Sequence, residues 1–277
     1  MKINKIYNED CLDTMSRMPN CCIDLVITSP PYDNLREYHG YIFYFEDIAK
    51  ALYRVIKNGG VVVWVVGDST EKGTESLTAF KQALFFKKIG FNIHDTMIYA
   101  KNNYIPLNHN RYDQQFEYMF ILSKGKPKTF NPIRIPTLTC GGRTSRRKKK
   151  SIGIPAYAVR SRSAVTVTKP EKLKSNIWFY NVGHNDNTSH PAPFPEKLVE
   201  DHILSWSNSG DLIYDPFMGS GTTAKMSFLL HRNYIGSEIS SKYCAEIEKR
   251  MLNTYNKLLV EKVKSISIHI VLNLRDL

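Results

Sequence analysis

Short apolar runs and amphipathic segments follow one another along most of this chain. Runs rich in branched or other apolar residues predict buried strands at 23–28, 61–66 and 212–214. Apolar residues at helical spacing predict helices at 77–89 and 222–230. Strands that are apolar throughout are typical of a sheet covered by helices on both faces. The alternation therefore predicts an α/β fold with a doubly wound, mostly parallel sheet.

The same patterns place the remaining elements. Further strands are expected at 5–8, 91–100, 116–122 and 234–236, and further helices at 11–18, 41–56, 193–206 and 242–260. We expect the helix at 41–56 to end at Asn58-Gly59-Gly60, because glycine is common just beyond a helix C-terminus. The apolar, branched segment 266–274 fits an extra strand, a helix end or a contact with a partner.

Residues 125–189 differ from both flanking regions because they contain few helix signals and many basic and polar residues. Blocks of like charge are usually solvated loops, but this one lies between two regular halves of the chain, which favours an inserted module that contacts nucleic acid. The candidate nucleic-acid contacts are Arg143, Arg146, Arg147, Lys148, Lys149 and Lys150. The aromatic run Trp178-Phe179-Tyr180 suggests that the insert has some packing of its own.

The net charge of the chain predicts an anionic partner. The net charge is +12, and no apolar run approaches the roughly twenty residues of a membrane span, so nucleic acid is a better partner than a membrane. The N-terminal residues lack the apolar core of a signal peptide. The cysteines form no Cys-x-x-Cys pair, so neither a disulfide framework nor a zinc site is indicated. We therefore expect a cytoplasmic protein.

The segment Ser29-Pro30-Pro31-Tyr32 directly follows the predicted strand 23–28. Ligands of α/β sheets bind beyond the carboxyl ends of parallel strands. The two prolines stiffen the loop and leave its carbonyl oxygens free to accept hydrogen bonds, and the segment adds one hydroxyl group and one aromatic ring. Taken alone, the segment is more typical of a connector. A second motif changes this interpretation.

That second motif is a glycine loop with an acid downstream. Asp215-Pro216-Phe217-Met218-Gly219-Ser220-Gly221-Thr222 follows the predicted strand 212–214 and opens the next helix. The loop lacks the lysine of an ATP-binding P-loop and the third glycine of a dinucleotide-binding loop. Glu238 follows the next strand, where nucleoside-binding sheets hold ribose hydroxyls. The added acid Asp215 favours a ligand that carries positive charge and no phosphate, such as S-adenosylmethionine.

In type and order, these motifs resemble those of bacterial DNA amino-methyltransferases that use S-adenosylmethionine, in their β arrangement. In that arrangement the Pro-Pro-Tyr motif comes first, a target-recognition region lies in mid-chain, and the glycine loop lies near the C-terminus. The resemblance implies a Rossmann-like methyltransferase sheet with an inserted target-recognition region. It divides the chain into a catalytic half at 1–124, a basic target-recognition insert at 125–189, a cofactor-binding half at 190–260 and a C-terminal tail at 261–277.

The resemblance also assigns residues to roles. The implied catalytic residues are Ser29, Pro30, Pro31 and Tyr32, and the implied cofactor-binding residues are Asp10, His190, Asp215, Phe217, Gly219, Ser220, Gly221, Thr222 and Glu238. Asp10 would face the cofactor adenine, but it fits a helix cap equally well. His190 would lie near the methionine end of the cofactor, and it also fits a structural loop histidine. Phe116 is a base-stacking candidate, although its place in a predicted strand favours a core residue.

The implied reaction is methyl transfer from S-adenosylmethionine to an exocyclic amino group in double-stranded DNA. Ser29 and the carbonyl group of Pro30 would accept hydrogen bonds from the amino group, and Tyr32 would stack on the flipped base. Serine at the first motif position goes more often with cytosine, so we expect N4 of cytosine, with N6 of adenine as the alternative. An RNA methyltransferase and an inactive DNA-binding protein are further alternatives. The resemblance leaves room for a homodimer and for a restriction endonuclease that shares the target site. No metal ligands are expected.

Overall fold

The computed structural model describes residues 1–31, 43–104, 106, 110–137, 144–147, 164–167, 169–182 and 194–273, with backbone alone for 144–147, 164–167 and 261–273. The chain forms two compact units. The larger unit contains Met1–Asn131 and Asn176–Leu277, and the smaller unit contains Pro132–Ser175. The smaller unit contains fewer residues than the insert expected at 125–189.

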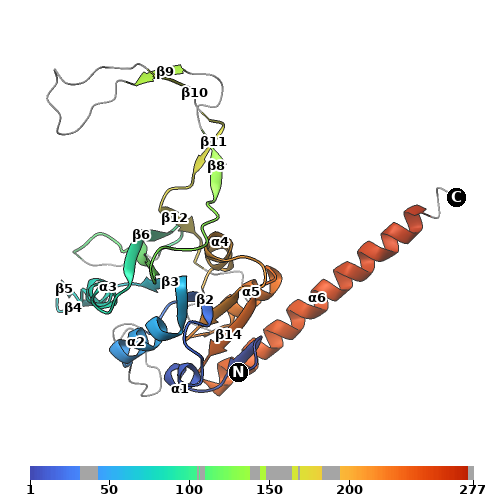
Figure 1. The fold of residues 1–277 in the computed structure, drawn as a ribbon, viewed down its shortest axis with the longest axis horizontal. Helices are drawn as coiled ribbons and strands as arrows, with labels where there is room; N and C mark the ends of the chain where they lie inside the picture. The colour runs from blue at the N-terminus through green and yellow to red at the C-terminus, as the bar shows by residue number, and fades with distance from the viewer. Residues whose placement is uncertain are drawn as a thin grey trace. The chain divides into compact units, whose positions relative to one another are not determined.

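The larger unit is built on one eight-stranded sheet (Figure 1). In spatial order its strands are β1 (Lys5–Tyr7), β14 (Asn233–Ser237), β13 (Leu212–Asp215), β2 (Ile23–Thr28), β3 (Ile56–Val66), β7 (Phe116–Ser123), β6 (Asn92–Lys101) and β12 (Ile177–Tyr180). Neighbouring strands are parallel except where β7 pairs antiparallel with β3 and with β6. The predicted mostly parallel sheet is therefore confirmed.

Helices cover both faces of this sheet. The helices α1 (Cys11–Ser16), α2 (Phe45–Val55) and α3 (Thr78–Lys88) pack against one another, as do α4 (Glu196–Trp206), α5 (Thr222–Leu229) and α6 (Ser241–Asn273). Val62, Trp64 and Val66 of β3 belong to the core that includes α1, α2 and α3. The intervening Val61, Val63 and Val65 point to the opposite face and are equally buried, as expected for a doubly wound fold.

The chain reverses its direction of winding between β13 and β2. From β2 it continues through α2 to the neighbouring strand β3, and from β13 it continues through α5 to β14 on the other side. The two halves of the chain thus meet at the centre of the sheet, where β13 pairs with β2. Such a switch point is where α/β sheets bind ligands, beyond the carboxyl ends of the strands.

The helix expected at 41–56 ends at Val55, within one residue of the predicted end. The role expected for Asn58-Gly59-Gly60 as its stop signal was wrong, because these residues lie inside β3. A Cβ atom on Gly60 would lie 2.9 Å from the carbonyl oxygen of Asp24 on β2, beside a register shift between Ile23 and Leu25. Gly60 therefore serves a close approach of two strands rather than a helix cap.

The segment 266–274 was left open between three structures, and the backbone shows a helix, because α6 continues to Asn273. The predicted independent packing of Trp178-Phe179-Tyr180 within the insert was wrong. These residues lie in β12 of the main sheet, where Trp178 packs on His202 and the Tyr180 hydroxyl donates to Asp201 over 2.6 Å.

The remaining strands in the described part of the chain form two-stranded antiparallel sheets. In the smaller unit β8 (Arg134–Pro136) pairs with β11 (Glu171–Leu173), and β9 (Thr144–Arg147) pairs with β10 (Ala164–Val167), both antiparallel. In the larger unit β4 (Thr70–Glu71) pairs with β5 (Thr74–Glu75). Among the helices in the described part of the chain, none has the length and apolar character needed to span a membrane.

Candidate active site

Three adjacent parallel strands bring the two sequence motifs to the same edge of the sheet. The Ser-Pro-Pro motif begins at Ser29, directly after β2, and the glycine loop begins at Asp215, the last residue of β13. Glu238 follows β14 on the far side of β13. Motifs that are nearly 190 residues apart in sequence are therefore neighbours in space, as the parallel arrangement requires.

Asp215 joins the two motifs through a buried set of hydrogen bonds. Its Oδ1 atom accepts from the hydroxyl of Thr28 over 2.7 Å and from the backbone N–H of Phe217 over 3.0 Å. Its Oδ2 atom accepts from the hydroxyl of Thr223 over 2.7 Å. The carboxylate thus connects the end of β2, the glycine loop and the start of α5. Direct contact of Asp215 with a cofactor remains a prediction.

The burial of Asp215 has an electrostatic consequence. Burial raises the pKa of Asp215 to about 6, against the lowering effect of the hydrogen bonds from Thr223, Thr28 and Phe217. A carboxylate that is removed from water without a cationic partner loses hydration that its hydrogen bonds only partly replace. This acid therefore holds the site together at the cost of some stability at neutral pH.

We expect Asp215→Asn to change the pH dependence of folding. Because the folded pKa of about 6 lies above the ordinary value of 3.8, the folded state favours the protonated acid. The stability of the wild type relative to the variant is then greatest below pH 4 and falls as the pH rises to 6, by up to about 3 kcal/mol. Urea denaturation between pH 4 and pH 8 measures this difference.

The control is Asp13→Asn, at an exposed position. Its stability difference from the wild type should vary much less over the same pH range. A constant difference between wild type and Asp215→Asn from pH 4 to pH 8 would contradict the prediction, because Asp215 would then titrate alike in both states.

The glycine loop is fixed against Glu238. Gly219 and Gly221 have φ angles of 54° and 81°, a region that residues with a side chain rarely adopt. The N–H of Gly219 donates to Oε2 of Glu238 over 2.8 Å, and the N–H of Ser240 donates to Oε1 over 2.9 Å. Burial raises the pKa of Glu238, and the nearby charge of Asp215 raises it further.

This donor and acceptor set fits S-adenosylmethionine. Each carboxylate oxygen of Glu238 accepts a hydrogen bond from a backbone N–H, and a carboxylate has about four acceptor positions, so capacity remains for ribose hydroxyls. The loop residues 219–222 carry no lysine or arginine that would favour a phosphate. A ligand with a ribose and a cationic sulfur matches these groups better than a nucleoside triphosphate.

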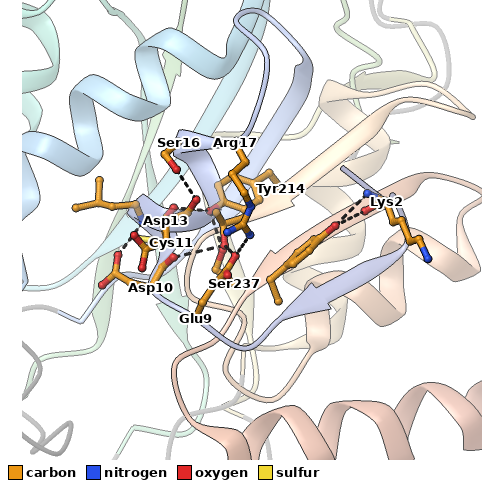
Figure 2. A network of polar contacts seen from close by, with 12 residues as sticks. Lys2, Glu9, Asp10, Cys11, Asp13, Ser16, Arg17, Tyr214 and Ser237 are labelled. Atoms are coloured by element: carbon orange, nitrogen blue, oxygen red, sulfur yellow. Dashed lines mark hydrogen bonds and ion pairs between the residues drawn. The ribbon is translucent and has the colours of Figure 1, made fainter.

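Asp10 caps the helix α1. Its Oδ1 atom accepts from the N–H of Leu12 over 2.7 Å, which confirms the capping interpretation. Figure 2 shows Asp10 close to a buried contact in which the Tyr214 hydroxyl lies 2.9 Å from Oγ of Ser237. Asn8 supports the same region, because its side chain donates to the carbonyl oxygen of Glu238 over 2.9 Å. The contact of Asp10 with the cofactor adenine remains a prediction.

Phe116 is not the core residue that its strand pattern favoured. It begins β7, 37% of its surface is exposed, and its ring meets Tyr118 edge to face. Because β7 is antiparallel to β3, its first residues lie at the edge where the parallel strands end. A base-stacking role for Phe116 remains a prediction. Phe217 of the glycine loop is half-buried and packs edge to face on Phe43.

Not all of the predicted site residues can be placed. Tyr32, Arg143, Lys148, Lys149, Lys150 and His190 lie outside the described residues. Arg146 and Arg147 lie on β9, where the backbone is described. Ser29 is half-buried and Pro30 is buried at the end of β2, with Pro31 next to them. Thr28 and Thr223 were not predicted as site residues, although both directly adjoin predicted motif residues.

The sheet, the glycine loop with its downstream acid and the Ser-Pro-Pro segment define an S-adenosylmethionine-dependent methyltransferase. Residues 23–249 match the N6 and N4 methyltransferase family, which is described as DNA methylase. The chain belongs to this family of DNA amino-methyltransferases.

Known proteins resemble the chain over most of its length. It is 52% identical over 240 residues to the orphan methyltransferase M.BamHII of Bacillus amyloliquefaciens, covering 84% of this chain and 90% of the relative. It is 26% identical over 254 residues to the DNA adenine methyltransferase YhdJ of Escherichia coli (strain K12), covering 86% and 79% of the two chains. The solved structure of the PvuII DNA methyltransferase (cytosine-N4-specific) has a TM-score of 0.66 at 22% identity and covers 92% of each chain, which shows the shared fold.

Proposed function

We propose that this protein methylates the exocyclic N4 atom of cytosine in duplex DNA after flipping the base out of the helix. The observation that supports the choice of base is Ser29. Within the segment Ser29–Pro31 its hydroxyl is the sole side-chain hydrogen-bond acceptor, and no carboxylate stands at this position. Bound S-adenosylmethionine would supply the methyl group: its bond to sulfur breaks as the bond to nitrogen forms, S-adenosylhomocysteine leaves, and the amino group releases one proton to solvent.

The protein's own contribution is to prepare the amino nitrogen for attack. The lone pair of an exocyclic amino group is delocalised into the ring, which makes the nitrogen a poor nucleophile. Acceptance of its hydrogens by the Ser29 hydroxyl and the Pro30 carbonyl would move the nitrogen toward tetrahedral geometry. The fixed φ angles of Pro30 and Pro31 hold these acceptors in place, so little reorganisation is needed during the reaction.

Asp215 makes the two motifs act together in this proposal. The hydroxyl of Thr28, which adjoins Ser29, donates to the same carboxylate that anchors the glycine loop. A shift of the cofactor loop would therefore displace the amino-group acceptors as well. Such coupling favours one fixed geometry for the methyl donor and the acceptor, and misplacement by about 1 Å costs on the order of a hundredfold in rate.

Methylation of adenine N6 is the second candidate, because the relative YhdJ is a DNA adenine methyltransferase. Mass spectrometry of nucleosides from unmethylated duplex DNA treated with the protein separates the two. N4-methylcytosine is the expected product, and N6-methyladenine as the sole product would overturn the assignment. A parallel reaction with structured RNA should give no methylated nucleoside. Methylated RNA with unmodified DNA would instead identify an RNA enzyme.

The basic block Lys148–Lys150 is proposed to contact DNA phosphates. Each such contact contributes about 0.9 to the slope of log affinity against log salt concentration for B-DNA. Replacing Lys148, Lys149 and Lys150 together with glutamine should weaken DNA binding and reduce the slope by about 2 to 3. Fluorescence anisotropy with a labelled duplex at several salt concentrations measures both quantities.

A matched control keeps the change in net charge constant. Lys242, Lys249 and Lys257 are exposed on α6, and their joint replacement with glutamine removes the same charge. This control should leave the salt slope close to that of the wild type. Equal slopes for both triple variants would show that the block acts only through the overall charge of the protein.

A further inference from the structure

One face of the first turns of α6 lies against the cofactor loop. Cys244, Ile247 and Arg250 are three residues apart, and side chains at this spacing share one face of a helix. The Cys244 thiol lies 3.5 Å from the carbonyl oxygen of Glu238. Ile247 is fully buried, and a Cβ atom on Gly221 would lie 2.8 Å from it. Gly221 therefore lets α6 pack directly on the loop.

Arg250 adds a polar contact to this packing. Its Nη1 atom donates to the carbonyl oxygen of Ser220 over 2.8 Å and lies 3.2 Å from the hydroxyl of Thr222. Only 14% of the Arg250 side chain is exposed. The guanidinium group thus binds the two residues that flank Gly221, from the side of the loop that α6 covers.

Glu196 holds this guanidinium in place. The Nη2 atom of Arg250 donates to Oε1 of Glu196 over 2.7 Å, and Lys225 of α5 pairs with the same oxygen. Burial raises the pKa of Glu196, but the hydrogen bonds from Lys225 and Arg250 outweigh this effect and lower it. Glu196 is the first residue of α4, so the ion pairs join the starts of α4 and α5 to α6.

We propose that Arg250 is a positioning residue that holds Ser220–Thr222 in the conformation that binds S-adenosylmethionine. The family match ends at residue 249, so it assigns no role to Arg250. A loop that is ordered before binding loses less conformational entropy when the ligand arrives, and this raises affinity. Arginine suits the task because its rigid fork binds Glu196 and Ser220 at the same time, whereas lysine has a single nitrogen.

The test compares two arginine-to-lysine variants by calorimetric binding of S-adenosylmethionine without DNA. Arg250→Lys should raise the Kd about tenfold, since it loses hydrogen bonds made by a charged group. Arg232→Lys is the matched control. Arg232 donates to the carbonyl oxygens of Ser207 and Leu230, away from the cofactor loop, so its Kd should stay at the wild-type value.

Two further measurements separate positioning from general stability. Hydrogen exchange of residues 219–222 in the absence of cofactor should be faster in Arg250→Lys than in Arg232→Lys. Glu196→Gln should also raise the Kd, and combining it with Arg250→Lys should give less than the product of the two single effects, because both act through one contact. At saturating S-adenosylmethionine, kcat of Arg250→Lys should approach that of the wild type.

A folded Arg250→Lys protein with the wild-type Kd would overturn the proposal. An equal rise in Kd for Arg250→Lys and Arg232→Lys would overturn it as well, because the effect would then follow loss of stability. The binding measurement uses no DNA, so its outcome does not depend on which base is methylated. A product other than N4-methylcytosine would therefore leave this inference intact.

Discussion

Replacing Tyr32 with alanine is expected to reduce methyl transfer by about 10- to 100-fold, the range that the loss of one base–aromatic stack produces. Tyr32 lies outside the described residues, and the expectation comes from its position directly after Ser29–Pro31, at the end of β2. A base that has left the duplex gives up stacking on its neighbours, and an aromatic ring beside the site replaces part of it. Initial rates at saturating S-adenosylmethionine measure the effect.

The control for this prediction is Tyr32→Phe, which keeps the ring and removes the hydroxyl group. It should retain most of the activity, while both variants should bind S-adenosylmethionine as tightly as the wild type, because the predicted cofactor-binding residues Gly219–Thr222 and Glu238 follow other strands, β13 and β14. Near-wild-type turnover of Tyr32→Ala would contradict the stacking role. A comparable loss in Tyr32→Phe would instead assign the effect to the hydroxyl group.

The sequence was sufficient to predict the centre of the fold and the placement of both motifs. Ile23–Thr28 was predicted with the bounds that β2 has, because a run rich in branched apolar residues suits a strand buried on both faces. The same holds for the start of α5 at Thr222, after the glycine loop. The loops that follow neighbouring parallel strands lie at the same edge of a sheet. The topology therefore places Ser29, after β2, near Asp215, at the end of β13.

Local signals failed where a distant contact decided the structure. Gly59 and Gly60 have the signature of a helix end, but in the fold Gly59 donates to the carbonyl oxygen of Lys124 over 2.6 Å and Gly60 lies against β2. Ile177–Tyr180 joins the main sheet by pairing with Ile98–Lys101, about 80 residues earlier. Nothing in either segment alone indicates its partner, since strand pairing depends on the whole chain.

The residues that support the site were harder to predict than the residues that line it. Thr28, Thr223 and Arg250 belong to no motif, and each acts by binding another protein group. Their residue types are common in strands and helices, so only their contacts in the folded protein distinguish them. Phe116 was mispredicted for a different reason. Its place in a predicted strand favoured burial, but it is the first residue of β7, and 37% of its surface is exposed.

Replacing Glu238 with glutamine is expected to weaken binding of S-adenosylmethionine by about 10- to 100-fold, the equivalent of one or two hydrogen bonds to a charged group. The carboxylate accepts from Gly219 and from Ser240 at once. Glutamine has one acceptor oxygen, so its amide nitrogen would face one of these N–H donors. The variant therefore loses acceptor capacity for ribose hydroxyls and also frees part of the glycine loop.

Glu248→Gln provides the matched control, because it removes the same charge at an exposed position on α6, one residue from the buried Ile247. Calorimetric titration with S-adenosylmethionine should give a wild-type Kd for this control. Thermal unfolding of both variants shows whether Glu238→Gln is folded, and the excess rise in its Kd over the control then measures the role of Glu238. A wild-type Kd in folded Glu238→Gln would exclude Glu238 as a ribose ligand.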